Sequence, residues 1–482
     1  MTKHGFVRTL QLTNFNMELK QKEGFIVAFF KKTDDPNVTL GAAERIAYGF
    51  GNAGNSFIVA AITGIMIYYF TETLHLSAGI VGTILLVSRL FDGVTDLVMG
   101  HIVDKTKSRF GKARPWILRA CLPYAVCGVL LFAVPTNLSV NLQYAYIFVM
   151  YNLTNSFAYT AIFVPYSTLP SMMTRNQYER GLLGVFSLVF SVAGGLIFNA
   201  VALNMIASFG GGTSAWVLTV GIFAALGVVL QMICFLGTKE RIVDATEEKG
   251  TPEPTLGVAV KSLFQNKYWI IHLINTVLVW LALGLSSTAI IYYADEILGN
   301  ETYYATLTNT SSIVQLLFLF IATFIMKKKG KVFCFRLGAA IMGFGLLIVI
   351  PFESSYPVLL ASSVLKGVGS GIAGAVLFGM GADTIDYGEW KTGIRAAGLA
   401  SSAMAFAQKV GQGFASGIVG WILELGKGIG ADAYIFSIKT SATYLPIALA
   451  VIILILTIPY KLDQEYDGII ADLNARNRVT EE

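Results

Sequence analysis

Twelve long apolar stretches dominate the sequence and limit the folds that are open to it. A helix needs about 20 consecutive apolar residues to cross the hydrocarbon core of a membrane. Only 13% of the 482 residues are charged, whereas soluble domains carry about 25%. The sequence therefore predicts an all-α membrane protein and excludes a soluble multidomain chain. The stretches lie near residues 45–70, 79–103, 115–135, 142–170, 182–207, 214–237, 268–294, 303–326, 333–351, 356–384, 397–424 and 441–460.

The placement of lysine and arginine tests this number of helices, because cytoplasmic loops collect both residues. With the amino terminus inside, 29 of the 35 fall on the cytoplasmic side and two, Lys427 and Lys439, fall outside. The remaining four lie within predicted helices. A wrong number of helices would not give this split, so we expect twelve helices, a multi-pass position in the cell membrane and both termini in the cytoplasm. The net charge of +5 belongs to these loops and does not indicate nucleic-acid binding.

The chain divides into two similar series of six helices. The longest internal polar segment separates them, and the basic cluster Lys105–Arg114 after the second helix has a counterpart, Lys327–Arg336, after the eighth. This layout predicts the major facilitator architecture, in which the solute site lies near the midplane between the halves. The tail before the first helix is either disordered or a short helix lying on the membrane surface. The expected parts are a cytoplasmic tail 1–41, a bundle 42–237, a cytoplasmic linker 238–267, a bundle 268–460 and a cytoplasmic tail 461–482.

Ionisable residues inside the predicted helices are the main functional signal. Arg89, Asp92 and Asp96 are spaced three and four residues apart, which puts them on one helical face. Each costs about 2.5–3.5 kcal/mol at bilayer depth, so each needs a partner or a function. Arg89 can neutralise one carboxylate in a structural ion pair, but it leaves the other unpaired. Two carboxylates with Thr95 beside them provide hard oxygen ligands that suit Na⁺ or a proton, and we expect a cation site here.

The second half carries two lysines inside its predicted helices. Lys409 could meet the carboxylates across a central cavity or bind solute oxygens. Lys366 could snorkel, pair with a distant carboxylate or line the pathway. A sugar site also needs hydrogen-bonding groups and aromatic faces, although aromatic residues at helix ends are more often interface anchors. The candidate substrate residues are Asn52, Asn55, Ser56, Tyr159, Ser167, Trp280, Lys366 and Lys409.

The sequence shows no signature of an enzyme. It has no nucleophile with a positioned base and no phosphate-binding loop, and its four cysteines lack metal-ligand or CxxC spacing. We therefore expect no cofactor apart from a coupling ion.

Three segments resemble a known transporter family. ERIAYGFGNAGNSF in the first helix, SRLFDGVTDLVMGHIVDKTKSRFGKARPW from Ser88 to Trp116, and ADTIDYGEWKTGIR after the tenth helix are similar to the glycoside–pentoside–hexuronide:cation symporters, the family of the melibiose permease. The resemblance implies sugar uptake driven by Na⁺, H⁺ or Li⁺ through alternating access. It implies that Asp92, Asp96 and Thr160 hold the cation, with Lys409 close by. It also implies a gating set, formed by Lys105, Arg109 and Arg114 in the basic loop and by Asp383 and Asp386, which would face such a loop.

Departures from the family pattern concern the solute. The melibiose permease has acidic residues where this chain has Ser56 and Phe163, and its fifth-helix arginine has no match in residues 181–195. With fewer acids and an additional Lys366, the cavity is relatively positive, so we hypothesise an anionic solute such as a hexuronide. Two alternatives remain open: a lysolipid or other amphiphile as the solute, and a membrane sensor that transports nothing.

Overall fold

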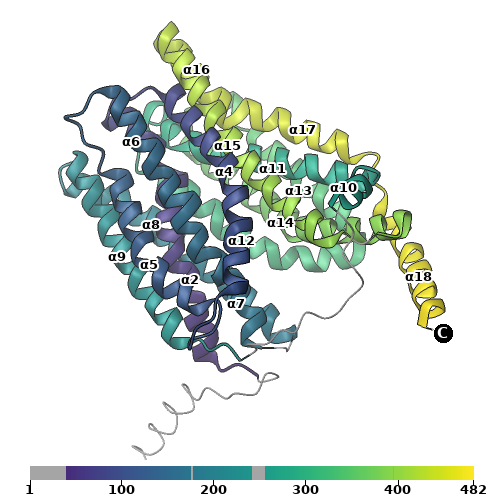
Figure 1. Cartoon of the computed structure of the whole chain (residues 1–482). Coiled ribbons are helices and arrows are strands. Elements are labelled where there is room, and N and C mark those ends of the chain that lie inside the picture. The colour runs from purple at the N-terminus through teal and green to yellow at the C-terminus, as the bar shows by residue number, and fades with distance from the viewer. Residues whose placement is uncertain (1–38, 175–176, 242–255, 395, 482) are drawn as a thin grey trace, which may run out of the picture.

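The computed structural model describes residues 39–174, 177–241, 256–394 and 396–481. Nearly all of the predicted amino-terminal tail and the middle of the predicted linker, 242–255, lie outside the described residues. Every regular element in the described part is a helix (Figure 1). The prediction of an all-α chain is confirmed.

Membrane-length helices account for most of this part. Ten segments are long and apolar enough to cross a membrane in the residues described. Two more helices, α4 (Ala78–Lys105) and α15 (Ala397–Ile429), have the length but carry charged residues at their centres. Together they match the twelve predicted stretches one for one. The ten are Ala42–Thr73 (α2 to η2), Arg114–Phe132 (α5), Val140–Met173 (α6 to α7), Glu179–Ser208 (in α8, Gln177–Ser208), Thr213–Gly237 (α9), Lys267–Ile297 (α11 and η4), Tyr303–Lys329 (α12), Lys331–Phe352 (α13 and η5), Tyr356–Thr392 (α14) and Ala431–Thr457 (α16 to α17).

Three elements extend beyond the predicted boundaries. Helix α14 continues to Thr392, so the segment expected to follow the tenth helix is its last part. The predicted linker contains a short helix, α10 (Leu256–Phe264). The predicted carboxy-terminal tail forms α18 (Leu462–Glu481), which packs on α14 and accepts a hydrogen bond at Asp472 from the indole of Trp390 over 3.1 Å. A search for apolar stretches of membrane length does not reveal the two added helices, because α10 has only nine residues and α18 is mostly polar.

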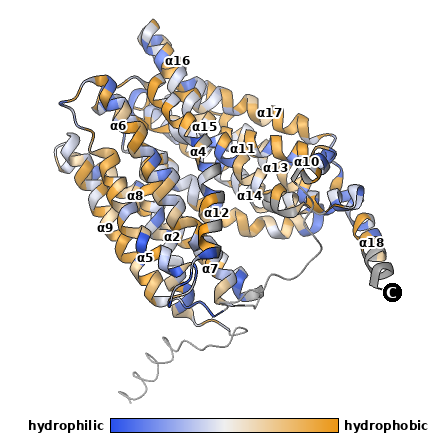
Figure 2. Ribbon diagram, in the orientation of Figure 1, coloured by the Kyte–Doolittle hydropathy of each residue, from blue (hydrophilic) through white to orange (hydrophobic). Residues whose placement is uncertain are grey.

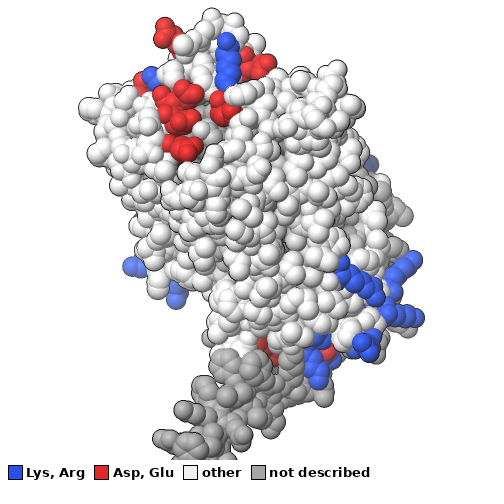
Figure 3. Space-filling view, turned by 90° about the vertical axis from the view of Figure 1, so that its left-hand side faces the viewer, with Lys and Arg blue, Asp and Glu red and all other residues white. Residues whose placement is uncertain are grey.

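The two ends of the bundle differ in charge. We call the end that carries Lys105–Arg114 and Lys327–Lys331 the basic end, and the end that carries Glu72, Asp295, Glu301 and Glu353 the acidic end. The acidic end is uppermost in Figure 3, where red side chains gather with a few blue ones among them, and most blue side chains lie lower down. Figure 2 shows mostly apolar helix surface between the two ends. This is the pattern expected of a chain that crosses a bilayer.

The two halves meet mainly along α4 and α15. A Cβ atom on Gly420 would lie 2.3 Å from the carbonyl oxygen of Ala78, so only glycine allows this approach. Polar links continue from mid-depth to the acidic end. Lys409 pairs with Asp96, the Trp421 indole donates to Thr83 over 2.8 Å, and Lys427 pairs with Glu72 at 2.8 Å.

The same capping device occurs at the basic end of each half. Glu240, just after α9, accepts hydrogen bonds from the amides of Lys112, Ala113 and Arg114 at the start of α5. Asp463, just after α17 (Leu445–Thr457), accepts one from the amide of Val332 at the start of α13 (Lys331–Leu347). Each carboxylate satisfies free amides at a positive helix end. It thereby ties the last helix of its half to the third.

Candidate ion and solute site

The buried carboxylate of Asp92 is held by neutral donors from a neighbouring span and by an arginine on its own helix. Asp92 is 1% exposed. It accepts hydrogen bonds from Asn155 Nδ2 at 2.9 Å and from Ser156 Oγ at 2.5 Å. The Arg89 guanidinium lies 3.4 Å from its Oδ2. The charge is therefore both paired and hydrogen-bonded, as burial requires.

A π-helical turn explains why these donors reach α4. The span Val140–Met173 changes from α6 (Val140–Asn152) to the π-helix η3 (Leu153–Tyr159) and back to α7 (Thr160–Met173). Thr160 follows Asn155 by five positions. This spacing is about one turn of a π-helix, but on an α-helix it would leave the two side chains about 140° apart. The irregular turn therefore brings Asn155, Ser156 and Thr160 to one face, and such turns are frequent at functional sites.

The second carboxylate joins the two halves. Asp96 accepts a hydrogen bond from Thr160 Oγ1 at 2.9 Å and forms an ion pair with Lys409 of α15. The Asp96 side chain is 34% exposed and that of Lys409 is 23% exposed. Arg89 leaves this carboxylate without a partner in its own half, and Lys409 meets it from the other half, which is one of the two roles considered for that lysine. The exposure shows that this pair, unlike Asp92, is open to solvent.

Thr95 lies beside the two carboxylates and donates to the backbone of its own helix. Its hydroxyl bonds to the carbonyl oxygens of Asp92 and Phe91, at 3.1 and 3.3 Å. Its oxygen still has lone pairs for a cation, as have those of Asp92, Asp96 and Thr160. Such hard oxygens suit Na⁺ or a proton. No cluster of three or more His, Cys, Asp or Glu residues that could hold a metal ion occurs in the described ranges.

A cavity of about 410 Å³ lies between the halves on the acidic side of the Asp96–Lys409 pair. This volume is within the range of ~300–1,000 Å³ for small-molecule sites. Two of the predicted substrate residues, Trp280 and Lys366, line it. Arg89 also lines it and so connects the cavity to the ion site. The other polar or aromatic groups of its wall are Thr63, Tyr151, Ser287, Thr288, Thr308, Ser311, Ser312, Gln315, Ser370, Gln412 and Ser416.

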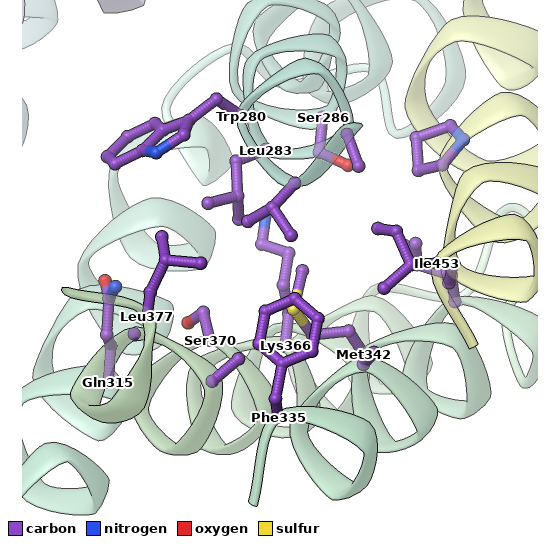
Figure 4. A pocket seen from close by; sticks show the side chains of 18 residues that line it. Trp280, Leu283, Ser286, Gln315, Phe335, Met342, Lys366, Ser370, Leu377 and Ile453 are labelled. Atoms are coloured by element: carbon purple, nitrogen blue, oxygen red, sulfur yellow. The ribbon is translucent and has the colours of Figure 1, made fainter. Parts of the chain in front are cut away.

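Lys366 is the cation of this cavity that has no partner in the described part of the chain. Its ammonium forms neither an ion pair nor a hydrogen bond with the residues that the structure describes, whereas Arg89 has Asp92. Figure 4 shows its side chain extending from α14 toward Leu283 of α11 (Lys267–Tyr292). It also lines an apolar side pocket of about 70 Å³ inside the second half. A lone cation at this depth needs a counter-charge.

The predicted polar residues of the first helix bond to neighbouring helices instead of lining the cavity. Asn52 donates to Ser187 Oγ at 2.9 Å. The hydroxyls of Ser56 and Ser191 lie 2.7 Å apart, and Asn55 accepts from Gln231 at 2.7 Å. These bonds hold α2 (Ala42–Ala60) against α8 and α9. They engage Asn52, Ser56 and the amide oxygen of Asn55, and the role of these residues in solute binding stays a prediction.

Two predicted residues of the fourth span also lie outside the cavity lining. The Tyr159 ring stacks on Phe163, with ring centroids 5.1 Å apart. Ser167 is exposed and donates to the carbonyl oxygen of Val164. Their role in solute binding stays a prediction.

The predicted gating residues lie at the basic end, within their own halves. Lys105 and Arg109 are exposed. Arg114 donates to the carbonyl oxygen of Phe235 at the end of α9. Asp383 pairs with Lys331 at 2.6 Å, and Asp386 accepts from the Tyr466 hydroxyl at 2.7 Å. Burial first, and then the hydrogen bond to Asp386, raise the pKa of Tyr466, so its hydroxyl remains the donor.

Sequence reasoning missed several residues of the site. Ser156 donates to Asp92, and Gln315 and Gln412 line the cavity. One signal was available, since Gln412 follows Lys409 by three residues and lies on the same helical face. The π turn that turns Asn155 toward Asp92 has no such signal in the sequence.

Comparison with known proteins identifies the family of this chain. The family described as "MFS/sugar transport protein" matches residues 47–464. The chain belongs to this family. Its members are membrane transporters of the major facilitator type, which confirms the predicted architecture and the expectation that the chain is not an enzyme. The glycoside–pentoside–hexuronide resemblance is confirmed with it.

Individual relatives support the family assignment over nearly the whole chain. The isoprimeverose transporter of Lactiplantibacillus pentosus is 27% identical, over 90% of this chain and 92% of its own length. The inner membrane symporter YicJ of Escherichia coli is 30% identical, over 80% and 83%. Among solved structures, a point mutant of the nucleoside transporter NupG has a TM-score of 0.65 at 15% identity, covering 86% of this chain and 99% of its own. That likeness shows the fold alone.

Proposed function

We propose that this transporter is a cation-coupled symporter for a sugar or glycoside, working by alternating access. Family membership supports sugar transport. The related inner membrane symporter YicJ supports coupling to a co-transported ion. The observation that carries the coupling is the ion pair between Asp96 of the first half and Lys409 of the second. It lies at mid-depth between the central cavity and the basic end. A cation site in that position can control access to the cavity.

The pair suggests how ion binding and solute binding are linked. Without an ion, Lys409 neutralises Asp96 and ties the halves together. Na⁺ or a proton at Asp96 takes over that role, with Asp92, Thr95 and Thr160 as further oxygen ligands, and frees the ammonium of Lys409 to bind solute oxygens. Ion and solute then favour each other by reciprocal linkage. A half-loaded site leaves a charge unpaired, which the membrane interior penalises, so only the empty and the doubly loaded states should reorient readily.

The charge of the two ends supports an orientation. By the positive-inside rule, the basic end belongs in the cytoplasm, which puts both termini there and the acidic end outside the cell membrane. The links Trp421–Thr83 and Lys427–Glu72, on the acidic side of the cavity, then close the outer side, which supports an inward-facing state. We propose the predicted division into two bundles, 42–237 and 268–460, as the moving units, with Lys105, Arg109, Arg114, Asp383 and Asp386 at the gate between them.

Uptake into proteoliposomes tests the coupling. The panel comprises neutral glycosides, uronides and lysolipids, each with a Na⁺ gradient, a proton gradient or neither. We expect Asp92→Asn and Asp96→Asn to insert normally but to lose concentrative uptake. Glu72→Gln, which removes an exposed carboxylate at the acidic end, is the matched control and should retain it. Normal accumulation in both aspartate variants would contradict the proposal.

The solute class that fits the cavity best is an anionic sugar such as a hexuronide. The support is the unpartnered ammonium of Lys366 beside Arg89 in the cavity wall, since a carboxylate on the solute would supply the missing counter-charge. We expect Lys366→Met to weaken uronide uptake by about tenfold, the effect of one charge-assisted hydrogen bond, and to leave neutral glycosides unchanged. Unaltered uronide transport in this variant would exclude the anionic solute while leaving the symporter intact.

One observation keeps the amphiphile alternative in the panel. The side pocket beside Lys366 is almost entirely apolar, with lining residues such as Phe335, Met342 and Ile453. Its volume of about 70 Å³ is far below the ~300 Å³ at the lower limit of small-molecule sites. Competition by lysolipids, but not by sugars, would favour this alternative. Absence of any substrate counterflow would favour the sensor.

A further inference from the structure

A separate cavity of about 240 Å³ lies at the basic end of the second half. It is bounded by the end of α12, the start of α13 and the junction between α17 and α18. Lys329, Arg336 and Lys461 line it together with one acid, Asp463. The carboxylate of Asp463 already accepts the amide of Val332 at 2.8 Å. The wall therefore has three cations facing one engaged carboxylate, an excess of positive charge.

The guanidinium of Arg336 is fixed in this wall with donors to spare. Its Nη2 donates to the carbonyl oxygen of Thr457 at the end of α17. Its Nε is buried and finds no hydrogen-bond partner in the part of the chain that the structure describes. Lys329 and Lys461 are exposed at the rim. A rigid arginine with two lysines beside it is the donor set that recognises a phosphate group.

Part of the rim of the same cavity is apolar. Phe333 is 44% exposed and Ile458 is 66% exposed, and both line the cavity at the membrane-facing ends of their helices. Exposed apolar side chains next to a basic pocket match the two chemical parts of a phospholipid, acyl chains below an anionic head. Basic pockets of this kind between membrane helices bind phosphate-bearing headgroups.

The first half shows that the pocket is not an automatic result of the repeated fold. There, the equivalent arginine, Arg114, stacks on the Phe235 ring at 4.8 Å from its centroid. The longer carboxylate of Glu240 spreads over three amides. The Arg114 guanidinium is therefore covered by an aromatic ring, whereas Arg336 lines an open cavity.

We propose that this pocket binds a phosphate group, presented by an anionic phospholipid from the leaflet at the basic end. Arg336 receives the phosphate oxygens, Lys329 and Lys461 close over it, and the acyl chains lie along Phe333 and Ile458. The site is independent of the transported solute, because it lies outside the central cavity. Its occupant would tie α12, α13, α17 and α18 together at the membrane surface.

The test uses the full-length protein in neutral detergent, with lipid binding measured by native mass spectrometry and by the rise in Tm. The ligands are phosphatidylglycerol, phosphatidylcholine as the neutral lipid, and inorganic phosphate. The test variant is Lys329→Gln/Lys461→Gln. The matched control is Lys327→Gln/Lys328→Gln, which removes the same charge from the last turn of α12 without touching the cavity lining.

We expect phosphatidylglycerol to bind the wild type and the control equally well, and the test variant at least about tenfold more weakly, since each lysine near an anionic headgroup contributes about a fivefold effect. Phosphatidylcholine should bind all three alike. A Tm rise with inorganic phosphate that is lost in the test variant would support the phosphate site with a soluble source. Equal weakening in both double variants would reduce the effect to general surface charge and overturn the proposal, as would no binding of either phosphate compound.

Discussion

The two halves of this transporter are alike at the basic end and opposite at mid-depth. At the basic end, each half uses an acid after its last helix to cap its third helix, and an arginine of the third helix to bond the end of the last: Glu240 with Arg114, and Asp463 with Arg336. At mid-depth the first half carries Asp92 and Asp96, and the second carries Lys366 and Lys409. The repeated device holds each bundle together, whereas the unequal charges exist only where the bundles meet.

This difference shows how two similar bundles can have different roles in one transport cycle. Taken alone, the first half would leave Asp96 without a basic partner and the second would leave its two lysines without an acid, and each is costly in a membrane. Joined, they neutralise each other at Asp96–Lys409, and they can separate at that point only if another cation or anion replaces the missing partner. We expect the mid-depth residues to govern transport and the two capping acids of the basic end, Glu240 and Asp463, to govern stability.

The largest effect should come from removing the pair between the halves. Asp96→Asn alone leaves Lys409 without a partner, a penalty of about 2.5–3.5 kcal/mol or roughly 100-fold in population. The double variant Asp96→Asn/Lys409→Met removes both charges, so it should regain the stability of the wild type in detergent but still lack concentrative uptake. Stability is measured by thermal unfolding, and concentrative uptake is measured in proteoliposomes, for Asp96→Asn, Lys409→Met and the double variant. Recovery of uptake in the double variant would show that the pair is only structural.

The basic-end caps should differ in strength between the halves. Glu240→Gln weakens three charge-assisted hydrogen bonds and should cost about 2–3 kcal/mol of stability. Asp463→Asn weakens one and should cost about 1 kcal/mol. We expect Tm in detergent to fall further for Glu240→Gln, with both variants still coupling ion and solute in uptake assays. Loss of coupling at unchanged Tm would break the proposed separation between stabilising and transporting residues.

The glycine contact between α4 and α15 provides a steric test of the interface. A methyl group on Gly420 would lie 2.3 Å from the backbone of Ala78, whereas one on Gly221 of α9 would lie 4.0 Å from the nearest atom, on Val129. Gly420→Ala should therefore disfavour the closed acidic end by about 1–3 kcal/mol, the usual range for overpacking, and Gly221→Ala should be nearly neutral. Labelling of a cysteine placed at Ser416 in the central cavity, from the acidic side, measures this opening. Equal labelling in both variants would place the hinge elsewhere.

The smallest effect belongs to the exposed pair at the acidic end. Lys427 and Glu72 have side-chain exposures of 40% and 25%, and exposed ion pairs contribute about 0–1 kcal/mol. Glu72→Gln should thus change the uptake rate by less than about fivefold, and the difference should shrink further at high salt. A large loss would mean that the acidic end, and not the Asp96–Lys409 pair, controls the closed state.

The amino-acid sequence by itself determined the twelve helices, the two halves, the two charged ends and the positions of the mid-depth charges. These features depend on segments of about 20 residues, because each helix must satisfy its own backbone and face lipid along most of its length. Helices α4 and α15 carry charged residues at their centres, yet each is still recognisable in the sequence as a stretch of membrane length.

Only the tertiary structure decided which charges are partners and which polar groups line the cavity. Lys409 and Asp96 are 313 residues apart, and their meeting depends on how α15 packs on α4. Asn52, Asn55 and Ser56 are polar residues of the kind that a solute site uses. They nevertheless bond to α8 and α9. The π turn before Thr160 moves three donors onto Asp92 and Asp96. A side chain's partner is set by helix rotation and contact between distant segments, and neither is encoded in the local pattern of apolar and polar residues.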